Sequence, residues 1–210
     1  MDVSYITAEM SDDFARSVRL GAEAGVSVVS IRSKAWGKAI EDLSADEVAE
    51  ARRILAEHRM RVGMVLSPVG KCDITDDAAV AKHGDILNRT IRLAHALGAD
   101  TIRAFPFRPP NPTPFTDSRF DEYRDRVVER WAPWAEMAGA EGVSVCFEWV
   151  GTTLVLTAEQ MRRVVDDLGE PAHVGVIWEI DVSAQAGESP EAGYPHIRGL
   201  IRDTHIKRFD

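Results

Sequence analysis

Short apolar runs alternate along the chain with longer segments in which apolar residues recur at helical spacing. The runs are apolar throughout rather than at every second position, which is typical of parallel strands buried on both faces. Seven such runs are present, at residues 3–6, 26–31, 62–66, 101–105, 143–149, 173–178 and 204–206. The strand–helix unit repeats about every 30 residues, which predicts an α/β fold with a parallel sheet.

Capping residues and helix breakers set the expected boundaries of the helices. Ser11 is expected to cap the first helix, because acidic residues follow it in the first turn. Ser44 and Glu47 have the spacing of a capping box. Pro133 is expected to kink or break the long helix that contains it. Residues 183–190 are polar and are expected to form a loop.

Two architectures fit this alternation, an open doubly wound sheet and a (β/α)8 barrel. The doubly wound sheet predicts a glycine-rich phosphate turn after the first strand, and residues 5–10 contain no glycine. The barrel predicts polar residues at the carboxyl end of nearly every strand. This chain has such residues in Glu9, Arg32, Lys71, Arg103, Glu148, Glu179 and His205. We therefore predict one domain of (β/α)8 TIM-barrel type over residues 1–210.

The predicted barrel is incomplete at its C-terminal end, because a closed barrel needs an eighth strand. An uncovered sheet edge favours aggregation. Either a partner chain covers this edge or a further strand lies outside the sequence. We expect a homo-oligomer.

Composition narrows the classes of partner. The net charge is −9 and the pI about 5.2, which argues against nucleic acid, because phosphate binding needs a basic face. No apolar stretch is long enough to cross a membrane, and no signal peptide is visible at the N-terminus. Cys72 and Cys146 fit no zinc or disulfide pattern. The expected location is the cytoplasm.

Three of the strand-end residues suggest a metal centre. Glu148, Glu179 and His205 follow successive predicted strands, and two carboxylates with an imidazole suit a hard or borderline divalent cation. The alternative is structural, since Glu148 could pair with Arg103 or Lys71 as an ordinary strand-end acid. Asp181 is a substitute ligand, because it would share the face of Glu179 if the strand continued.

The basic strand-end residues are candidates for substrate binding. Arg32, Lys71 and Arg103 could bind a carboxylate, a phosphate or sugar hydroxyls. They could equally neutralise the acidic rim. Lys207, beside His205, joins them as a candidate substrate-binding residue.

The chain resembles the xylose isomerase-like TIM barrels, the sugar phosphate isomerase/epimerase superfamily. The resemblance spans essentially the whole chain and rests on residues 29–32, 36–38, 67–71, 97–105, 147–148, 174–179 and 204–207. It implies a divalent cation held by Glu, Asp, His and a second Glu, as in ketose epimerases. Glu148 and His205 match the first Glu and the His, and Glu179 occupies the position of the Asp. The second Glu belongs to a strand that this sequence lacks, and Val182 stands where the family has another histidine.

Together these observations predict a metal-dependent isomerase or epimerase acting on a small sugar or sugar derivative. Glu148 is expected to serve as metal ligand and as the base that removes a proton next to a carbonyl. Mn²⁺ or Mg²⁺ is expected, with Co²⁺ or Zn²⁺ as alternatives. Two other functions stay open, a sugar-derivative lyase or dehydratase on the same site and a non-catalytic binding or scaffold protein. A zinc-dependent endonuclease would need a basic face, which this chain lacks.

Overall fold

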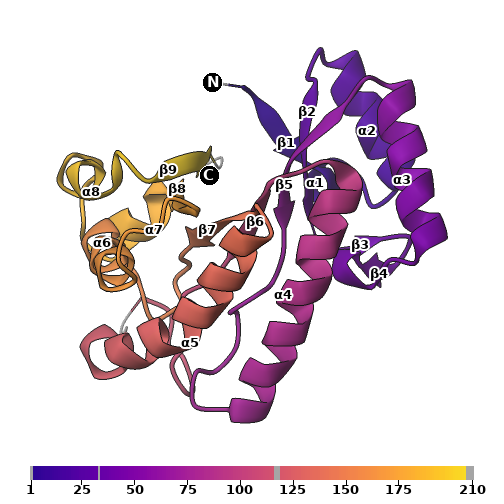
Figure 1. The fold of residues 1–210 in the computed structure, drawn as a ribbon. Coiled ribbons are helices and arrows are strands. Elements are labelled where there is room, and N and C mark those ends of the chain that lie inside the picture. Colours follow the sequence, from indigo (N-terminus) through magenta and orange to yellow (C-terminus); the bar gives the residue numbers. More distant parts are fainter. Residues whose placement is uncertain (1, 33, 116–118, 207–210) are drawn as a thin grey trace. The chain divides into compact units, whose positions relative to one another are not determined.

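The computed structural model describes residues 2–32, 34–115 and 119–206. The chain divides into two compact units, one of Met1–Ser67 and Asp85–Ile102, the other of Pro68–Gly84 and Arg103–Asp210. The prediction of a single domain stays a prediction. Parallel strands run through both units in the order β1-β2-β5-β6-β7-β8-β9 (Figure 1).

The first unit contains three strands of this sheet, covered by helices. The strands are β1 (Ser4–Ile6), β2 (Val28–Arg32) and β5 (Arg61–Leu66), which pair in parallel. The helical segments are α1 (Thr7–Met10), α2 (Phe14–Glu23), the 3-10 turn η1 (Ile40–Asp42), α3 (Ala45–Glu57) and the second half of α4 (Asp77–Leu97). A two-stranded hairpin of β3 (Lys34–Ala35) and β4 (Lys38–Ala39) precedes η1. The first four residues of β2 are buried, as its continuous apolar pattern requires.

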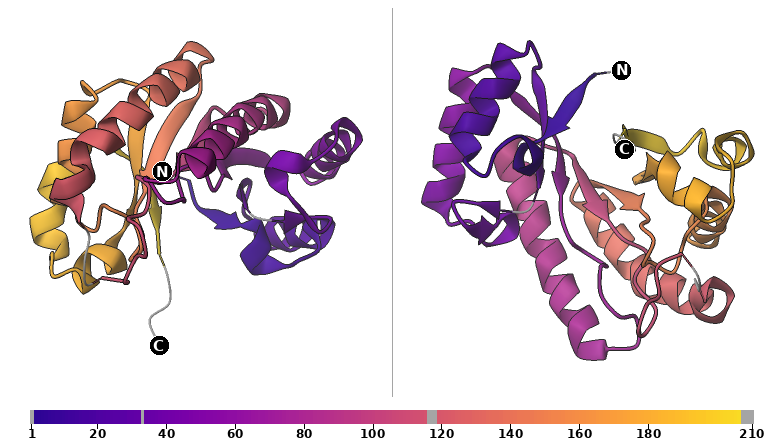
Figure 2. Two further views of the ribbon diagram at one scale, coloured as in Figure 1. Left: turned by 90° about the horizontal axis from the view of Figure 1, so that it is seen from below. Right: turned by 180° about the vertical axis from the view of Figure 1, so that it is seen from behind.

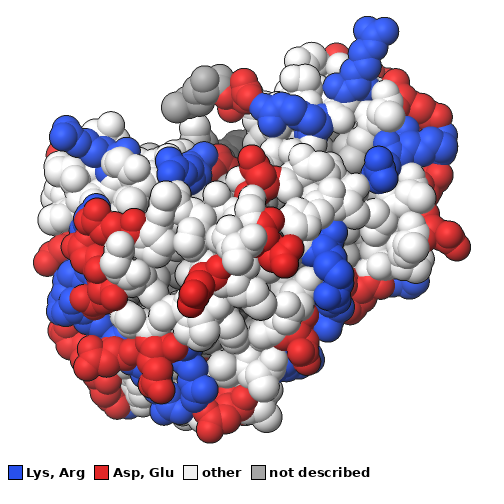
Figure 3. All heavy atoms as spheres, in the orientation of Figure 1, with Lys and Arg blue, Asp and Glu red and all other residues white. Residues whose placement is uncertain are grey.

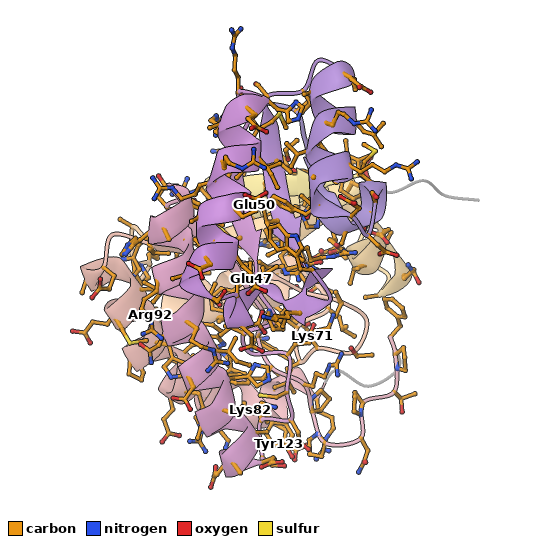
Figure 4. The ribbon with its side chains drawn as sticks, turned by 90° about the vertical axis from the view of Figure 1, so that its right-hand side faces the viewer. Glu47, Glu50, Lys71, Lys82, Arg92 and Tyr123 are labelled. Atoms are coloured by element: carbon orange, nitrogen blue, oxygen red, sulfur yellow. The ribbon has the colours of Figure 1, made fainter. Side chains whose placement is uncertain are left out.

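Side-chain caps explain where two helices of this unit begin. Ser44 accepts a hydrogen bond from the backbone N–H of Glu47, whose carboxylate accepts from the N–H of Ser44, so the expected capping box at α3 is confirmed. Figure 4 shows Glu47 in the first turn of α3. The expectation for α2 is wrong by two residues, because its cap is Asp13 rather than Ser11. Residues 7–10 form the extra helix α1 instead.

The second unit contains the C-terminal strands of the sheet. Strand β6 (Thr101–Ala104) passes from the first unit into the second and is followed by β7 (Ser144–Glu148), β8 (Val174–Glu179) and β9 (Ile201–His205). The helices are α5 (Phe120–Ala140), α6 (Ala158–Asp167), α7 (Ile180–Gln185) and α8 (Pro190–Ile197). Figure 2 shows these strands and helices from two further directions. All six residues of β8 are buried.

The pairing of β8 with β9 contains one irregularity. Val176 lies opposite Ile201, and the next residue, Ile177, lies opposite Asp203, so Arg202 has no partner residue on β8. This is the pattern of a β-bulge. Gly175 leaves room for it, because a Cβ atom there would lie 2.5 Å from Cγ of Arg202.

Two further expectations about elements need correction. Pro133 does not break its helix, because α5 continues through it from Phe120 to Ala140, and the expected kink stays a prediction. The proline is exposed, so water can solvate the carbonyl group that its missing N–H leaves unpaired. Residues 180–185, expected to contain the start of a polar loop, form the short helix α7.

The expected fold class is confirmed. Seven parallel strands alternate with helices, the arrangement of an incomplete (β/α)8 TIM barrel. No helix among the described residues is long and apolar enough to cross a membrane. The expected homo-oligomer stays a prediction.

Charged side chains of both signs are interspersed on the face of the molecule that Figure 3 shows. Several form ion pairs within the second unit, such as Arg124 with Asp167 and Arg163 with Asp121. Exposed pairs of this kind contribute at most about 1 kcal/mol each to stability.

Candidate metal centre

The three predicted ligands are the last residues of three neighbouring strands. Glu148 ends β7, Glu179 ends β8 and His205 ends β9. Glu179 lies directly opposite His205, and Glu148 lies opposite Ile177, two residues before Glu179. Side chains two residues apart on a strand share a face, so this register places all three side chains on the same face of the sheet.

Their ligand atoms converge within bonding reach of a single ion. One donor atom from each residue lies within 4.8 Å of the others. Nδ1 of His205 is 3.1 Å from Oε1 of Glu179 and 3.7 Å from Oε1 of Glu148. Both glutamates are buried, with 4% and 1% of their surface exposed. Two buried carboxylates this close repel each other unless a cation lies between them.

In the metal-free site, His205 supplies that cation. Burial acts to lower the pKa of His205, but hydrogen bonds with Glu148 and Glu179 outweigh it and raise the pKa to about 9. Burial acts to raise the pKa of Glu148, whereas its hydrogen bonds with His205 and Glu179 and the charge of Arg103 bring it well below its usual range. At neutral pH the site therefore holds an imidazolium beside an ionised carboxylate.

The donor set fits a divalent cation. Carboxylate oxygens and an imidazole nitrogen suit Mg²⁺, Mn²⁺ or Zn²⁺. Nε2 of His205 is buried without a hydrogen-bond partner among the described residues, and Oδ2 of Asp203 lies 3.9 Å away. A carboxylate near the second nitrogen is the usual partner that orients a metal-bound histidine. Three protein ligands also leave positions open for substrate oxygens.

Arg103 is bound to one of the candidate ligands. Nη1 of Arg103 lies 2.8 Å from Oε2 of Glu148, and the two side chains are only 10% and 6% exposed. The guanidinium also lies 4.9 Å from the centre of the Phe105 ring. The ion pair considered as the structural alternative for Glu148 is thus present. It engages one carboxylate oxygen and leaves Oε1 directed towards His205.

Lys71 lies on the loop between β5 and α4 (Figure 4). Its Nζ lies 4.6 Å from the centre of the Phe105 ring, the same ring that Arg103 contacts. Burial lowers the pKa of Lys71, and the charge of Arg103 lowers it further. The structure therefore places two of the four predicted substrate-binding residues around one aromatic ring beside Glu148.

The remaining sequence-predicted residues are Arg32, Lys207 and Asp181. Arg32 belongs to the first unit, where Nη1 lies 2.8 Å from Oε1 of Glu9, and its role in substrate binding stays a prediction. Lys207 lies outside the described residues. Asp181 lies in helix α7 rather than on a continued strand, so the geometry assumed for it as a substitute ligand is wrong.

Sequence reasoning missed two residues near Lys71. Nδ1 of His83 accepts a hydrogen bond of 3.1 Å from the backbone N–H of Gly70, and burial lowers the pKa of His83, which keeps the ring neutral and able to accept. Arg108 follows β6 on a proline-rich loop and pairs with Asp73 as an isolated bridge. Neither residue stands at a strand end. Only the loop's length and its prolines indicated that this segment shapes a site.

Gly70 offers a test of how rigidly this loop is held. Its φ is +78°, and a Cβ atom would lie 2.0 Å from the carbonyl oxygen of Phe105. Gly98 has a similar φ of +71° with nothing within 4 Å of a Cβ atom. We expect Gly98→Ala to cost about 1–2 kcal/mol from backbone strain alone. Gly70→Ala is expected to cost at least about 2 kcal/mol more, because backbone atoms must move. Urea unfolding measures the loss in the free energy of unfolding for each variant. Equal losses would show that the backbone of this loop can move aside at little cost.

Comparison with known proteins places the fold in a family. A model of the family described as xylose isomerase-like TIM barrel matches residues 18–208. No curated protein matches the sequence.

Several solved structures have the same fold. The probable 3-DHS dehydratase AsbF involved in petrobactin synthesis from Bacillus anthracis is 17% identical, with a TM-score of 0.80 over 100% of this chain and 74% of that chain. A xylose isomerase-like TIM barrel protein from Mycobacterium smegmatis, in complex with magnesium, is 16% identical with a TM-score of 0.76, covering 100% and 76%. A D-psicose 3-epimerase in the presence of D-fructose is 20% identical with a TM-score of 0.77, covering 98% and 72%.

Proposed function

From the premise that the chain belongs to the xylose isomerase-like TIM barrel family, we propose that it is a metal-dependent isomerase or epimerase. Its substrate is a small sugar or sugar derivative, and the reaction moves a proton on the carbon next to a carbonyl. The observation that carries the proposal is the convergence of Glu148, Glu179 and His205 at the ends of three adjacent strands. Epimerases of the same fold support it.

In this proposal Glu148, Glu179 and His205 hold the ion. A bound divalent cation would act as a Lewis acid and polarise the carbonyl and hydroxyl oxygens of the substrate. The burial of both glutamates excludes water from their carboxylates, which strengthens every charge interaction at the site. Neighbouring structures contain magnesium or zinc. The chain's own donors fit either ion or Mn²⁺, so the proposal leaves the choice to measurement.

Glu148 is also the proposed proton acceptor. Arg103 fixes its Oε2, so Oε1 is the oxygen left on the side of His205 and Glu179. The depressed pKa of Glu148 keeps it ionised at neutral pH, as a proton acceptor must be. The same shift makes it a weak base. The proton it removes must therefore already be acidic, which a carbon next to a polarised carbonyl satisfies.

The test begins with metal-free protein. We expect one equivalent of Mn²⁺, Mg²⁺, Co²⁺ or Zn²⁺ to bind, measured by calorimetry and by metal analysis. The loaded protein is then incubated with ketoses in D₂O, and exchange of the proton next to the carbonyl is followed by NMR. Glu136→Gln, which changes an exposed acid of α5, is the control variant and is expected to bind metal like the unaltered protein. Absence of stoichiometric metal binding would end the proposal.

A dehydratase acting on a sugar derivative is the second candidate. Among the described residues, the cluster contains two carboxylates, and one of them must serve both as ligand and as base. An elimination needs one proton acceptor, whereas epimerisation is usually served by a pair. The dehydratase AsbF shares the fold. Product analysis over a panel of keto-sugars and inososes separates the two reactions. Ligand binding without turnover of any compound would favour the scaffold alternative.

Metal binding is expected to depend on pH through His205. A ligating imidazole must be neutral, and the pKa of His205 is raised to about 9 in the metal-free protein. Binding therefore releases a proton below that pH, and the apparent affinity should rise about tenfold per pH unit between about pH 6 and pH 8. Because this folded-state pKa is raised from 6.5, its stabilisation of the metal-free protein is complete below pH 6.5 and lost as pH rises through about 9. Calorimetry in buffers of different ionisation enthalpy measures the released proton. A pH-independent affinity would contradict this linkage.

A further inference from the structure

Two loops of the second unit are tied together by backbone hydrogen bonds, and each carries a cation. Lys71 lies on the first loop and Arg108 on the second. The N–H of Phe105 donates to the carbonyl of Val69 at 2.8 Å, and the N–H of Arg108 donates to the carbonyl of Cys72 at 2.8 Å. The carbonyl of Arg108 accepts from Ile74 at 3.0 Å. The backbone positions from which the side chains of Lys71 and Arg108 project are therefore fixed and close to each other.

Neither cation has an acidic partner among residues 2–32, 34–115 and 119–206. Nζ of Lys71 contacts the face of Phe105 and makes no ion pair there. Nε of Arg108 is buried and has no hydrogen-bond partner within the same residues. Burial and the charge of Arg103 lower the pKa of Lys71 most; the charge of Arg108 lowers it further, while the charges of Glu148 and Glu179 raise it. Half-buried like charges without a direct ion-pair partner are costly unless a ligand adds to the compensation.

The nearby acids are already engaged. Glu148 is bound to Arg103, and Glu179 faces His205. The carboxylate of Asp73 accepts two hydrogen bonds from Thr75, from its N–H and its hydroxyl. Asp203 lies near Nε2 of His205. A divalent cation held by the two glutamates would compensate their negative charge, and the positive charges of Lys71 and Arg108 would then have no acid among the described residues paired directly with them.

We infer that the substrate of this site carries an acidic oxygen group, a carboxylate or a phosphate, which Lys71 and Arg108 bind. The inference rests on the proposed function, because it concerns the substrate of the same metal centre. The ammonium group offers a point charge and the guanidinium a planar pair of donors, a combination that suits both kinds of anion. The polyhydroxylated part of the substrate then extends from these cations, past Phe105, towards Glu148.

Lys71 and Arg108 could instead serve only to offset the charge of the two glutamates. That role predicts a different result for their removal. Without Lys71, the glutamates would bind a divalent cation more tightly, and neutral and acidic ligands would change alike. An anion-binding role predicts a loss confined to acidic ligands.

Three polyols that differ only at one end allow a direct test. D-Glucitol is neutral, L-gulonate carries a carboxylate at the carbon equivalent to C6 of D-glucitol, and D-glucitol 6-phosphate carries a phosphate at that carbon. Their dissociation constants for protein saturated with Mn²⁺ are measured by calorimetry. At least one acid is expected to bind about 10- to 100-fold more tightly than glucitol, the value of one or two charge-assisted hydrogen bonds. The acid that benefits identifies the group.

Variants assign this preference to the two cations. Lys71→Met and Arg108→Met are each expected to weaken acid binding about tenfold and to leave glucitol unchanged. Lys71→Arg is expected to keep most of the preference, which shows that a charge rather than a side-chain volume is needed. Lys82→Met changes an exposed lysine on α4 and is the control (Figure 4). Metal stoichiometry and melting temperature are recorded for each variant.

The outcomes separate this inference from the proposed function. Metal binding with equal affinity for the acids and glucitol, or no detectable binding of either acid, overturns the inference alone. So does a preference that survives in both methionine variants. Failure of the unaltered protein to bind metal overturns the proposed function, and with it the inference.

Discussion

Glu179→Gln is expected to weaken metal binding by more than about 100-fold, because residues that only orient a ligand already cost 10- to 100-fold when they are lost. Glu179 is almost fully buried and lies 3.1 Å from the imidazole of His205. The amide keeps the shape of the side chain but removes its charge. Calorimetric titration of the metal-free variant with Mn²⁺ measures the effect.

The control for this substitution is Glu136→Gln, which removes an exposed acid from the same unit. It should leave metal affinity within about twofold, since exposed charges are screened by solvent. Metal affinity preserved in Glu179→Gln would mean that the carboxylate is no ligand. The cluster would then be a buried ion-pair network, and this result would favour a non-catalytic binding or scaffold protein.

Arg103→Met is expected to destabilise the metal-free protein by about 3–5 kcal/mol, because it removes the 2.8 Å ion-pair partner of a buried carboxylate and leaves His205, at 3.7 Å, as the remaining cation beside Glu148. The ion pair is 2.8 Å long and both side chains are nearly inaccessible to water. Urea unfolding measures the change. Arg124→Met breaks a pair with Asp167 whose side chains are 28% and 29% exposed, and should cost no more than about 1 kcal/mol.

Two further measurements identify the cause of this destabilisation. Adding Glu148→Gln to Arg103→Met should recover much of the lost stability, because the uncompensated charge disappears. Saturating Mn²⁺ should also reduce the deficit, since an ion bound to Glu148 compensates the same charge. A deficit that neither change reduces would point to lost packing against Phe105 instead.

The candidate ligands could be predicted because parallel strands deliver their last residues to one end of a sheet. Glu148, Glu179 and His205 each follow a run of buried apolar residues, and this signal is local. The ion pair of Glu148 with Arg103 was foreseen only as an alternative, since sequence patterns do not determine which of two nearby charges meet. Metal ligation by these residues stays a prediction.

Arg108 and His83 could not be found in this way. Arg108 lies on a loop whose path includes residues with positive φ, Phe107 at 60° and Asn111 at 50°. No periodicity describes such a path. His83 lies on helix α4, as does His95, and only the three-dimensional structure shows that the ring of His83 accepts a hydrogen bond from the N–H of Gly70.

Differences in the fold have similar local causes. Asp13 and Ser11 are both good helix caps, and the structure uses the one that precedes Phe14, the first buried residue of α2. Helix α7 has six residues, too few for an apolar period to be recognised. Helix α5 tolerates Pro133 because this residue is exposed to solvent. Its exposure cannot be predicted until the buried face of the helix is known.

The unpartnered Arg202 determines which residue meets Glu179. If β9 continued from the pairing of Ile201 with Val176 without the bulge, Glu179 would lie opposite Thr204 rather than His205. The imidazole would then shift along the strand and project from the opposite side of the sheet. Loss of the bulge with the sequence unchanged would thus bring a hydroxyl opposite Glu179 in place of a nitrogen donor, although no atom of the three ligands had been altered, whereas deletion of Arg202 itself would keep His205 there.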